Sequence, residues 1–272
     1  DLSSGETLAL TGESGSGKSV TSMAAMRLLP DALEITSGAV SVGDQDLFEL
    51  SESNMQTVRG RRVAMIFQNA MTALNPVQTV GQQVAETLRL HTDLRGSALR
   101  NRVVQLFNEV GIPDSEQRFD FYPHELSGGQ QQRVMIAMAL ACEPEVLIAD
   151  EPTTALDVTI QEQVLKLIRE LTESRKLAVL LITHDMGVVR NTADEVAVMY
   201  RGEIIERAGV DDFFHNPKEE YSRRLIDALP DLSHFQSAAV EEPLLQLDDV
   251  KIHFPIRKGV LQRVVDHTRA VD

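Results

Sequence analysis

The sequence predicts an α/β fold, because short apolar segments typical of buried parallel strands alternate with segments of helical periodicity. The strand-like segments are residues 7–11, 63–67, 146–151 and 177–183. A helix is expected between the last two of them, from Thr159 to Ser174. The chain has 272 residues, of which 43% are apolar, so it can bury one substantial α/β core and a smaller subdomain.

A glycine-rich loop follows the first strand-like segment. Residues 12–19 read Gly-Glu-Ser-Gly-Ser-Gly-Lys-Ser, the complete G-x-x-x-x-G-K-S/T pattern, and a helix is expected over residues 20–29, ended by Pro30. In such a loop backbone N–H groups surround the β-phosphate, Lys18 reaches the β- and γ-phosphates, and the Ser19 hydroxyl binds Mg²⁺. The predicted nucleotide-binding residues are Gly12, Glu13, Ser14, Gly15, Ser16, Gly17, Lys18, Ser19 and Val20. The sequence therefore predicts a nucleoside triphosphate site, and a Gly/Ser-rich surface turn is the alternative.

The composition argues against several other classes of protein. No apolar run reaches the roughly 18 residues of a membrane span, and no signal-peptide pattern opens the chain. The single cysteine, Cys142, excludes an internal disulfide and a multi-cysteine metal site, so a cytoplasmic location is expected. The net charge of -15 argues against broad nucleic-acid binding, which needs an excess of lysine and arginine, although local basic patches are compatible with it.

Two carboxylates stand at the end of the apolar segment 146–151. Ligands of α/β sheets bind at the carboxyl ends of the strands, so Asp150 is expected to hold Mg²⁺ through water and Glu151 to orient or deprotonate an attacking water. The alternative, two solvated acids that cap the next helix, suits Asp157 better than this pair. His184 ends the following strand and is expected to reach the same phosphate, with a structural histidine as the alternative.

Other segments also have features of ligand sites. Gln68 ends the segment 63–67, a suitable place for a side chain that senses a ligand. Residues 79–109 have helical periodicity interrupted by a turn, which predicts a helical insert. Ser127 is expected to be the N-cap of a helix over residues 131–141, and the glycines after it leave N–H groups accessible to an anion.

Taken together, these motifs resemble those of the ATP-binding cassette (ABC) ATPase family. In order they are GESGSGKS at 12–19, Gln68, LSGGQ at 126–130, LIADEP at 147–152, ALD at 155–157 and THD at 183–185. The resemblance covers residues 1 to about 205. It implies a P-loop NTPase (RecA-like) core with a helical subdomain at about 71–142 and a partial antiparallel β subdomain.

The resemblance also implies roles for the residues around one nucleotide. Gln68 would bind Mg²⁺ and water, Glu151 would be the catalytic base, and His184 would be the switch residue on the γ-phosphate. ATP and Mg²⁺ are the implied cofactors, and Ser19, Gln68 and Asp150 are the implied metal-binding residues.

A second set of residues would act on a nucleotide held by an opposing ATPase domain. The implied residues are Ser127, Gly128, Gly129 and Gln130, which would bind its γ-phosphate. Asp157 would contact the opposing domain. Each domain therefore carries two half-sites, and hydrolysis would need a head-to-tail pair.

The residues within and beside these motifs are similar to those of one branch of the family, the oligopeptide, dipeptide, nickel and glutathione importers. The similarity lies in residues 65–76, 150–159, 213–217 and 221–223. It implies an ATP-hydrolysing subunit that energises import of peptides or related small solutes. Members of that branch often bind an iron–sulfur cluster through C-terminal cysteines, but no cysteine follows Cys142, so no cluster is expected.

The same resemblance implies the partners and the location. The partners would be a second ATPase cassette, in tandem or in a homodimer, transmembrane permease subunits and, indirectly, an extracytoplasmic solute-binding protein. No nucleic-acid partner is expected. The protein would be peripheral, on the cytoplasmic face of the inner (plasma) membrane.

The C-terminal region resembles the opening of a second cassette. Residues 244–254 read as a strand, 255–260 as a turn and 264–271 as another strand, with 206–243 as a C-terminal extension and linker and 244–272 as the start of that cassette. Since Asp1-Leu2 looks like the end of a cassette's second strand, the chain is interpreted as a fragment of a tandem two-cassette ATPase, similar to microcin C, peptide or glutathione importer ATPases.

This interpretation has two consequences. The adenine-stacking aromatic of the family would lie before Asp1. The edge of strand 38–42 would lack its neighbour, so we expect residues 244–254 to pack on that edge in the same chain or in a neighbouring one. A C-terminal β-hairpin that belongs to this domain is the alternative.

Competing functions fit the motifs less well. The non-transport alternative is an ABC translation factor or regulatory protein. Such a protein has a segment similar to DEPTNHLD at the position where this chain has DEPTTALD. A DNA-repair or chromosome-organising ATPase would insert a long coiled coil between Gln68 and Leu126, and a P-loop kinase would not explain LSGGQ. A module that binds ATP without turnover stays open, because a sequence shows groups and not rates.

Overall fold

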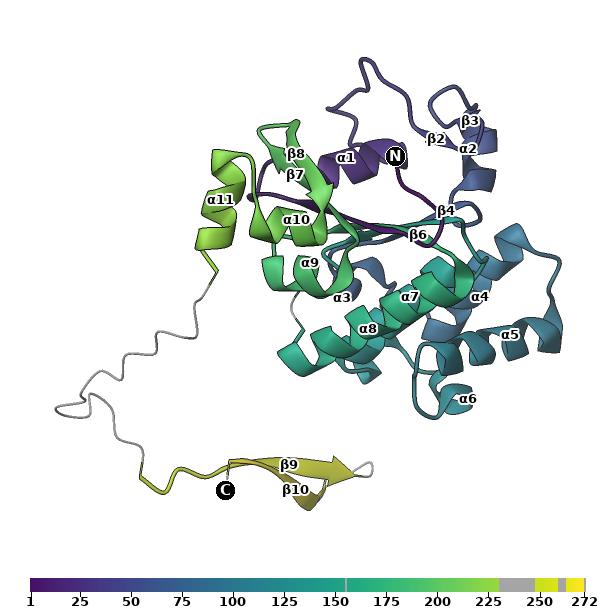
Figure 1. Cartoon of the computed structure of the whole chain (residues 1–272). Helices are drawn as coiled ribbons and strands as arrows, with labels where there is room; N and C mark the ends of the chain where they lie inside the picture. Colours follow the sequence, from purple (N-terminus) through teal and green to yellow (C-terminus); the bar gives the residue numbers. More distant parts are fainter. Residues whose placement is uncertain (155, 230–247, 259–262, 272) are drawn as a thin grey trace. The chain divides into compact units, whose positions relative to one another are not determined.

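The computed structural model describes residues 1–154, 156–229, 248–258 and 263–271. The chain forms two compact units, Asp1–Leu229 and Pro230–Asp272, each of which is described here by itself. The first unit is a mixed α/β structure with a central sheet between helices, so the predicted fold class is confirmed (Figure 1).

The central sheet has six strands in the order β4-β5-β6-β1-β7-β8. Its strands are β1 (Thr7–Thr11), β4 (Val63–Ile66), β5 (Val146–Asp150), β6 (Ala178–Ile182), β7 (Glu195–Tyr200) and β8 (Glu203–Gly209). Neighbours pair in parallel except β7 and β8, which are antiparallel. The four predicted apolar segments therefore form adjacent strands, and their carboxyl ends meet at one edge of the sheet.

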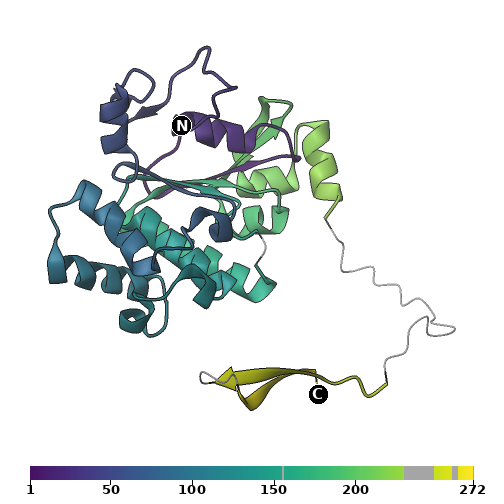
Figure 2. The ribbon, with the colours of Figure 1, turned by 180° about the vertical axis from the view of Figure 1, so that it is seen from behind.

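Helices cover both faces of this sheet, with α1 on one face and α7 and α8 on the other (Figures 1 and 2). Side chains of β5 alternate between the two cores, since Leu147 and Ala149 contact one apolar cluster and Ile148 contacts the other. Burial on both faces explains why the strand is continuously apolar rather than alternating.

The helices of the first unit differ widely in length. The longer ones are α1 (Lys18–Ala25), α4 (Val80–His91), α5 (Gly96–Glu109), α7 (Gly128–Leu140), α8 (Val158–Arg175) and α11 (Glu220–Asp227), and the shorter ones are α2 (Glu52–Val58), α3 (Ala70–Ala73), α6 (Ser115–Arg118), α9 (Met186–Thr192) and α10 (Val210–His215), with a 3₁₀ turn at Pro123–Glu125. The helical insert expected over 79–109 is confirmed as α4 and α5. None of the helices in the described ranges is both long and apolar enough to cross a membrane.

Two predicted helix boundaries are wrong. The helix expected over 20–29 runs from Lys18 to Ala25, because the end of the glycine loop already has helical geometry and Arg27, with φ 51°, turns the chain before Pro30. The helix expected over 131–141 begins at Gly128, because the Ser127 side chain caps it directly. Ser127 is therefore the N-cap, as predicted.

The small antiparallel element is shorter than expected. The strand predicted over 38–42 is reduced to β2 (Ser41–Val42), which pairs with β3 (Gln45–Asp46). Gly43, with φ 57°, makes the tight turn between them. Val42 packs with Met55 and Met26 in the apolar cluster on the α1 face of the sheet.

The first unit continues beyond the expected boundary at residue 205. That boundary lies inside β8, and Phe213 of α10 is completely buried against β1 and β7 residues. Leu225 and Leu229 pack on the same apolar cluster. Residues 206–229 are therefore integrated into the unit, while the rest of the expected linker lies outside the described residues.

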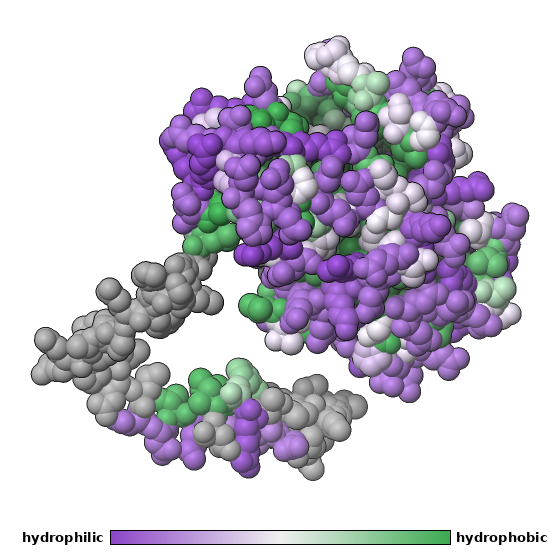
Figure 3. Space-filling view, viewed as in Figure 1, coloured by the Kyte–Doolittle hydropathy of each residue, from purple (hydrophilic) through white to green (hydrophobic). Residues whose placement is uncertain are grey.

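The second unit contains a β-hairpin, β9 (Ile252–Lys258) with β10 (Arg263–Val271). The turn expected from residue 255 is wrong, because Pro255 pairs with His267 within the ladder. Residues 244–247, the start of the expected strand, lie outside the described residues. Apolar side chains on the hairpin are exposed, among them Phe254 at 61% and Val264 at 48% (Figure 3).

The expected packing of residues 244–254 on strand 38–42 would join the two units, and it stays a prediction here. Residues 252–254 pair with β10, and the ladder partner of Val42 is Gln45 of β3. Exchange of this strand with a neighbouring chain stays a prediction.

Candidate active site

The glycine-rich loop joins β1 to α1 and closes around the side chain of Lys18. Gly12 and Gly17 have φ of 147° and 111°, conformations that favour glycine. A Cβ on Gly12 would lie 2.1 Å from the carbonyl oxygen of Met199. Lys18 Nζ donates hydrogen bonds to the carbonyls of Gly12 and Glu13, at 2.7 and 2.9 Å. The loop therefore surrounds an ammonium group with backbone atoms.

Burial and two neighbouring carboxylates have opposite effects on the pKa of Lys18. Burial lowers the pKa of Lys18, while the charges of Glu151 and Asp150 act in the opposite direction. Lys18 is only 6% exposed. A desolvated ammonium group beside the N-terminus of a helix is well suited to bind phosphate oxygens.

Ser19 and Asp150 form the part of the site that fits a metal ion. The Ser19 hydroxyl donates to Asp150 Oδ1 at 3.1 Å, which joins the first turn of α1 to the end of β5. Burial raises the pKa of the Asp150 carboxyl, and the bond from Ser19 opposes that effect. No group of three or more His, Cys, Asp or Glu in the described ranges could hold a metal alone. One carboxylate and one hydroxyl fit Mg²⁺, which usually takes its other ligands from phosphates and water.

Glu151 is the centre of a hydrogen-bonded cluster. Gln68 Nε2 and Thr154 Oγ1 each donate to Glu151 Oε2 at 2.9 Å, and His184 Nδ1 lies 2.9 Å from Oε1. Burial acts to raise the pKa of Glu151, but the hydrogen bonds of His184, Thr154 and Gln68 outweigh it and the pKa is lowered. Glu151 is therefore ionised at neutral pH. Its φ of 45° is uncommon for a residue other than glycine and is typical of functional sites.

The sheet order explains why these side chains meet. Gln68 follows β4, Glu151 follows β5 and His184 follows β6, and these three strands are parallel neighbours. Thr154 was missed by the sequence reasoning. Its position three residues after Glu151, where the Thr154 amide donates to the Glu151 carbonyl at 3.1 Å, is the turn signal that could have found it.

The LSGGQ residues form a separate cluster at the start of α7. The Ser127 side chain accepts from the amide of Gln130, whose side chain accepts from the amide of Ser127. A Cβ on Gly129 would lie 2.6 Å from Ile160 Cγ2, so glycine is required where α7 meets α8. Asp157 caps α8 through the Ile160 amide at 3.0 Å. No hydrogen bond in the described chain joins Ser127 to the glycine loop or to Glu151.

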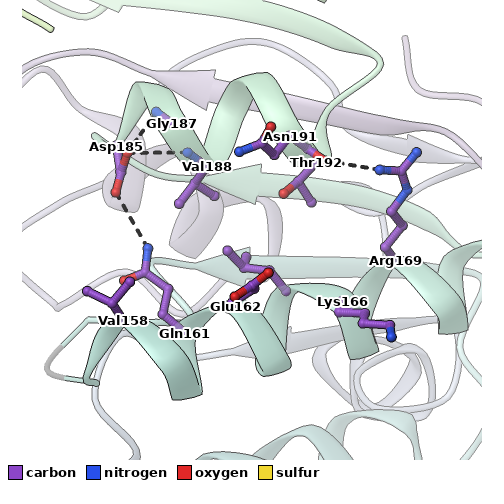
Figure 4. A pocket seen from close by; sticks show the side chains of 11 residues that line it. Val158, Gln161, Glu162, Lys166, Arg169, Asp185, Gly187, Val188, Asn191 and Thr192 are labelled. Carbon is purple, nitrogen blue, oxygen red and sulfur yellow. Dashed lines mark hydrogen bonds between the residues drawn. The ribbon is translucent and has the colours of Figure 1, made fainter. Parts of the chain in front are cut away.

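A groove lies between α8 and α9, the helices that follow Glu151 and His184 in the sequence (Figure 4). It has a volume of about 560 Å³ and includes none of the predicted site residues. Gln161 Nε2 donates to Asp185 Oδ2 at 3.5 Å, and Arg169 donates to the Asn191 carbonyl at 3.1 Å. Asp185 also caps α9 through the amides of Gly187 and Val188. These contacts join the two helices that follow Glu151 and His184.

Comparison with protein families matches residues 1–154 to the family model of ABC transporters. Over its whole length the chain is 48% identical to the peptidoglycan transport ATP-binding protein YejF of Agrobacterium fabrum, of which it covers 50%. It is 45% identical to the glutathione import ATP-binding protein GsiA of Escherichia coli K12, of which it covers 49%. The chain thus spans about half the length of the curated relatives it matches.

Solved structures support the same relationship. The dimeric post-hydrolysis structure of the ATP-binding cassette MJ0796, bound to ADP and Pi, has a TM-score of 0.68 and 28% identity. The match covers 77% of this chain and 88% of that one. CbiO1 of Clostridium perfringens, part of an ABC transporter complex, has a TM-score of 0.67 and 29% identity, with 78% and 80% of the two chains covered.

Proposed function

The chain belongs to the ABC transporter family, and we propose that it is the ATP-hydrolysing subunit that energises import of peptides or related small solutes. The observation that carries the proposal is the Glu151 carboxylate, ionised and held by Gln68, Thr154 and His184. It stands directly after Asp150, which contacts the glycine loop through Ser19. A relative named for glutathione import supports the direction of transport, and this relative together with one named for peptidoglycan transport supports the solute class.

In this proposal the glycine loop binds the phosphates of ATP. Loop amides and the Lys18 ammonium group neutralise the β- and γ-phosphates. Ser19, Asp150 and Gln68 would hold Mg²⁺, which when bound neutralises charge on the same phosphates. The dimeric cassette MJ0796, which has the same fold and is bound to ADP and Pi, supports nucleotide binding by this chain.

Hydrolysis then depends on the groups around Glu151. A water oxygen forms a bond to the γ-phosphorus, the bond from that phosphorus to the bridging oxygen breaks, and the water proton passes to Glu151. The His184 side chain is 65% exposed while that of Glu151 is 15% exposed, so the imidazole is open to a phosphate at the mouth of the site. Gln68 holds the carboxylate on its other oxygen.

The second half-site acts on a partner cassette. Ser127, Gly128, Gly129 and Gln130 would bind the γ-phosphate of an ATP on the opposing domain, and Asp157 would contact that domain. In the described residues no hydrogen bond joins Ser127 to the glycine loop of its own domain, which supports action on a nucleotide of the opposing domain. The proposed partners also include transmembrane permease subunits and, indirectly, an external solute-binding protein. The proposed location is peripheral, on the cytoplasmic face of the membrane.

We also propose that residues 244–272 are the opening strands of a second cassette, with residues 1–205 as the main body of the first. Exposed Phe254 and Val264 support this, because an isolated hairpin is marginally stable and needs further packing. Slow amide hydrogen exchange of β9 in a chain of the relatives' full length, with fast exchange in the present chain, is the expected result. Equal rates would contradict the assignment.

Phosphate release from ATP tests the function. The full chain, reconstituted with membrane subunits, should release phosphate, and stimulation by those subunits separates a transport ATPase from a non-transport one.

Lys18→Ala should abolish tight ATP binding, because it removes the ammonium group from the phosphate site. Lys166→Ala, at a side chain 76% exposed on α8, is the matched control. Unchanged ATP affinity in Lys18→Ala would contradict the phosphate-loop assignment.

A further inference from the structure

A C-terminal helix of the first unit makes direct contact with the phosphate loop. The backbone N–H of Glu13 donates a hydrogen bond to the hydroxyl oxygen of Tyr221, at 2.9 Å, although the two residues are 208 positions apart. Tyr221 lies in the first turn of α11, and the centroid of its ring lies 4.5 Å from that of Tyr200, with an angle of 39° between the ring planes. Burial raises the pKa of the Tyr221 phenol, so its hydroxyl stays neutral at physiological pH.

The same residue of the loop also contacts the phosphate-binding lysine. The carbonyl of Glu13 accepts from Lys18 Nζ at 2.9 Å. Glu13 thus has its amide directed to Tyr221 and its carbonyl directed to Lys18. Beside it, the Gly202 amide donates to the Ser16 carbonyl at 2.9 Å, from the turn between β7 and β8. The outer side of the loop is therefore held by the C-terminal part of the unit.

The helix that carries Tyr221 is itself fixed to the sheet. The Glu206 carboxylate of β8 is 6% exposed and accepts from the amides of Lys218 and Glu219, at 2.8 and 3.0 Å. These amides lie immediately before α11, where an acidic group stabilises the first turn of a helix. Phe213 of α10, fully buried, packs in the same apolar cluster as Tyr221. Tyr221 therefore has a rigid support.

We propose that Tyr221 is a positioning residue for ATP binding, which holds the Glu13 peptide so that the glycine loop keeps the geometry that receives the phosphates. The inference rests on the proposed function, because it needs ATP at this loop. Without the hydroxyl, the Glu13 amide loses its partner, and the loop can rotate that peptide toward another acceptor. The carbonyl contact to Lys18 would change with it.

Tyr221→Phe is the direct test, because phenylalanine keeps the ring contact with Tyr200 and removes only the acceptor. A typical net hydrogen bond contributes about 1 kcal/mol, so the affinity for ATP should fall by about fivefold. Titration calorimetry with the full chain and ATP measures this. The KM for ATP in phosphate release should rise by a similar factor with kcat unchanged, since the reacting groups around Glu151 are not altered.

A matched control and a stability measurement separate this role from a structural one. Tyr122→Phe removes a hydroxyl from a tyrosine 39% exposed in the helical region and should bind ATP as the wild type does. The melting temperature of Tyr221→Phe should stay within about 4 °C of the wild type, because only one half-exposed contact is lost.

Wild-type ATP affinity in Tyr221→Phe, or a lower kcat with unchanged KM, would overturn the inference while the proposed function stands. Failure of the wild-type chain to bind ATP would overturn both.

Discussion

The phosphate loop and the Glu151 cluster lie at the same edge of the sheet but are held in different ways. Residues 12–19 are held through backbone atoms: carbonyls of Gly12 and Glu13 bind Lys18, and the Ser16 carbonyl accepts from Gly202. Glu151 is held through its side chain, by Gln68, Thr154 and His184. One region presents a cation and the other an ionised carboxylate.

In the proposed function this difference separates nucleotide binding from hydrolysis. A backbone-held loop depends on the space that missing Cβ atoms leave, so substitutions that add atoms should weaken nucleotide binding. A side-chain cluster depends on the chemical identity of its members, so isosteric substitutions should affect the reaction and leave binding intact. The following predictions are ordered by the size of the expected effect.

The largest effect is expected for Glu151→Gln. Glutamine keeps the size of the side chain but cannot accept the water proton, so phosphate release should slow by about 100-fold or more with ATP affinity retained. Single-turnover phosphate release and titration calorimetry measure the two quantities. Glu162→Gln, on the exposed part of α8, is the control for loss of one charge. A wild-type rate in Glu151→Gln would refute its role as base.

The next effect concerns the half-site at Ser127. Ser127→Arg should lower phosphate release of the paired cassettes by about tenfold or more, because removing a donor aimed at developing charge has at least that effect. ATP binding to Lys18 of the same domain should be unchanged. Ser127→Thr keeps the hydroxyl that caps α7 and serves as the control. Lost ATP binding in the isolated chain would argue against action in trans.

Gly12→Ala tests the space requirement of the loop. The new Cβ would lie 2.1 Å from the Met199 carbonyl oxygen, at a φ of 147°, so the loop must shift and ATP affinity should fall by about tenfold. Gly209→Ala is the matched control, since nothing lies within 4 Å of its Cβ position and its φ is -59°. Equal affinities of the two variants would show that the loop adapts freely.

The smallest effect is on stability. Burial acts to raise the pKa of Glu206, but its hydrogen bonds, including those from the Lys218 and Glu219 amides, outweigh this and lower the pKa from 4.5. The unfolded state therefore binds the proton more readily, so this contribution is full above pH 4.5 and is lost as the pH falls through the lower folded-state value.

Glu206→Gln removes this contribution. At pH 7 it should reduce the free energy of unfolding by about 1 kcal/mol, because glutamine keeps one acceptor oxygen but not the charge, and the difference from the wild type should shrink on acidification. Chemical denaturation at several pH values measures it, with the exposed Glu203→Gln as the control. A difference that grows as the pH falls would contradict the sign of the pKa shift.

Prediction from sequence was most successful where the signal is local. The glycine loop before α1, the carboxylates at the end of β5 and the Ser127 cap could be predicted because each depends on residues a few positions apart. Helix ends were less accurate: Lys18 and Gly128 begin helices that were expected to start two or three residues later, since glycines in the loops conceal where helical geometry begins.

The sequence by itself determined the strands of the core, the phosphate loop and the acidic pair, because apolar burial and backbone conformation are local constraints. Only the tertiary structure decided which side chains meet Glu151, since this follows from the order of β4, β5 and β6 in the sheet. It also decided the contact of Tyr221 with Glu13 across 208 positions. A hydrogen bond needs its two atoms close in space, and for distant residues only the folded chain sets that distance.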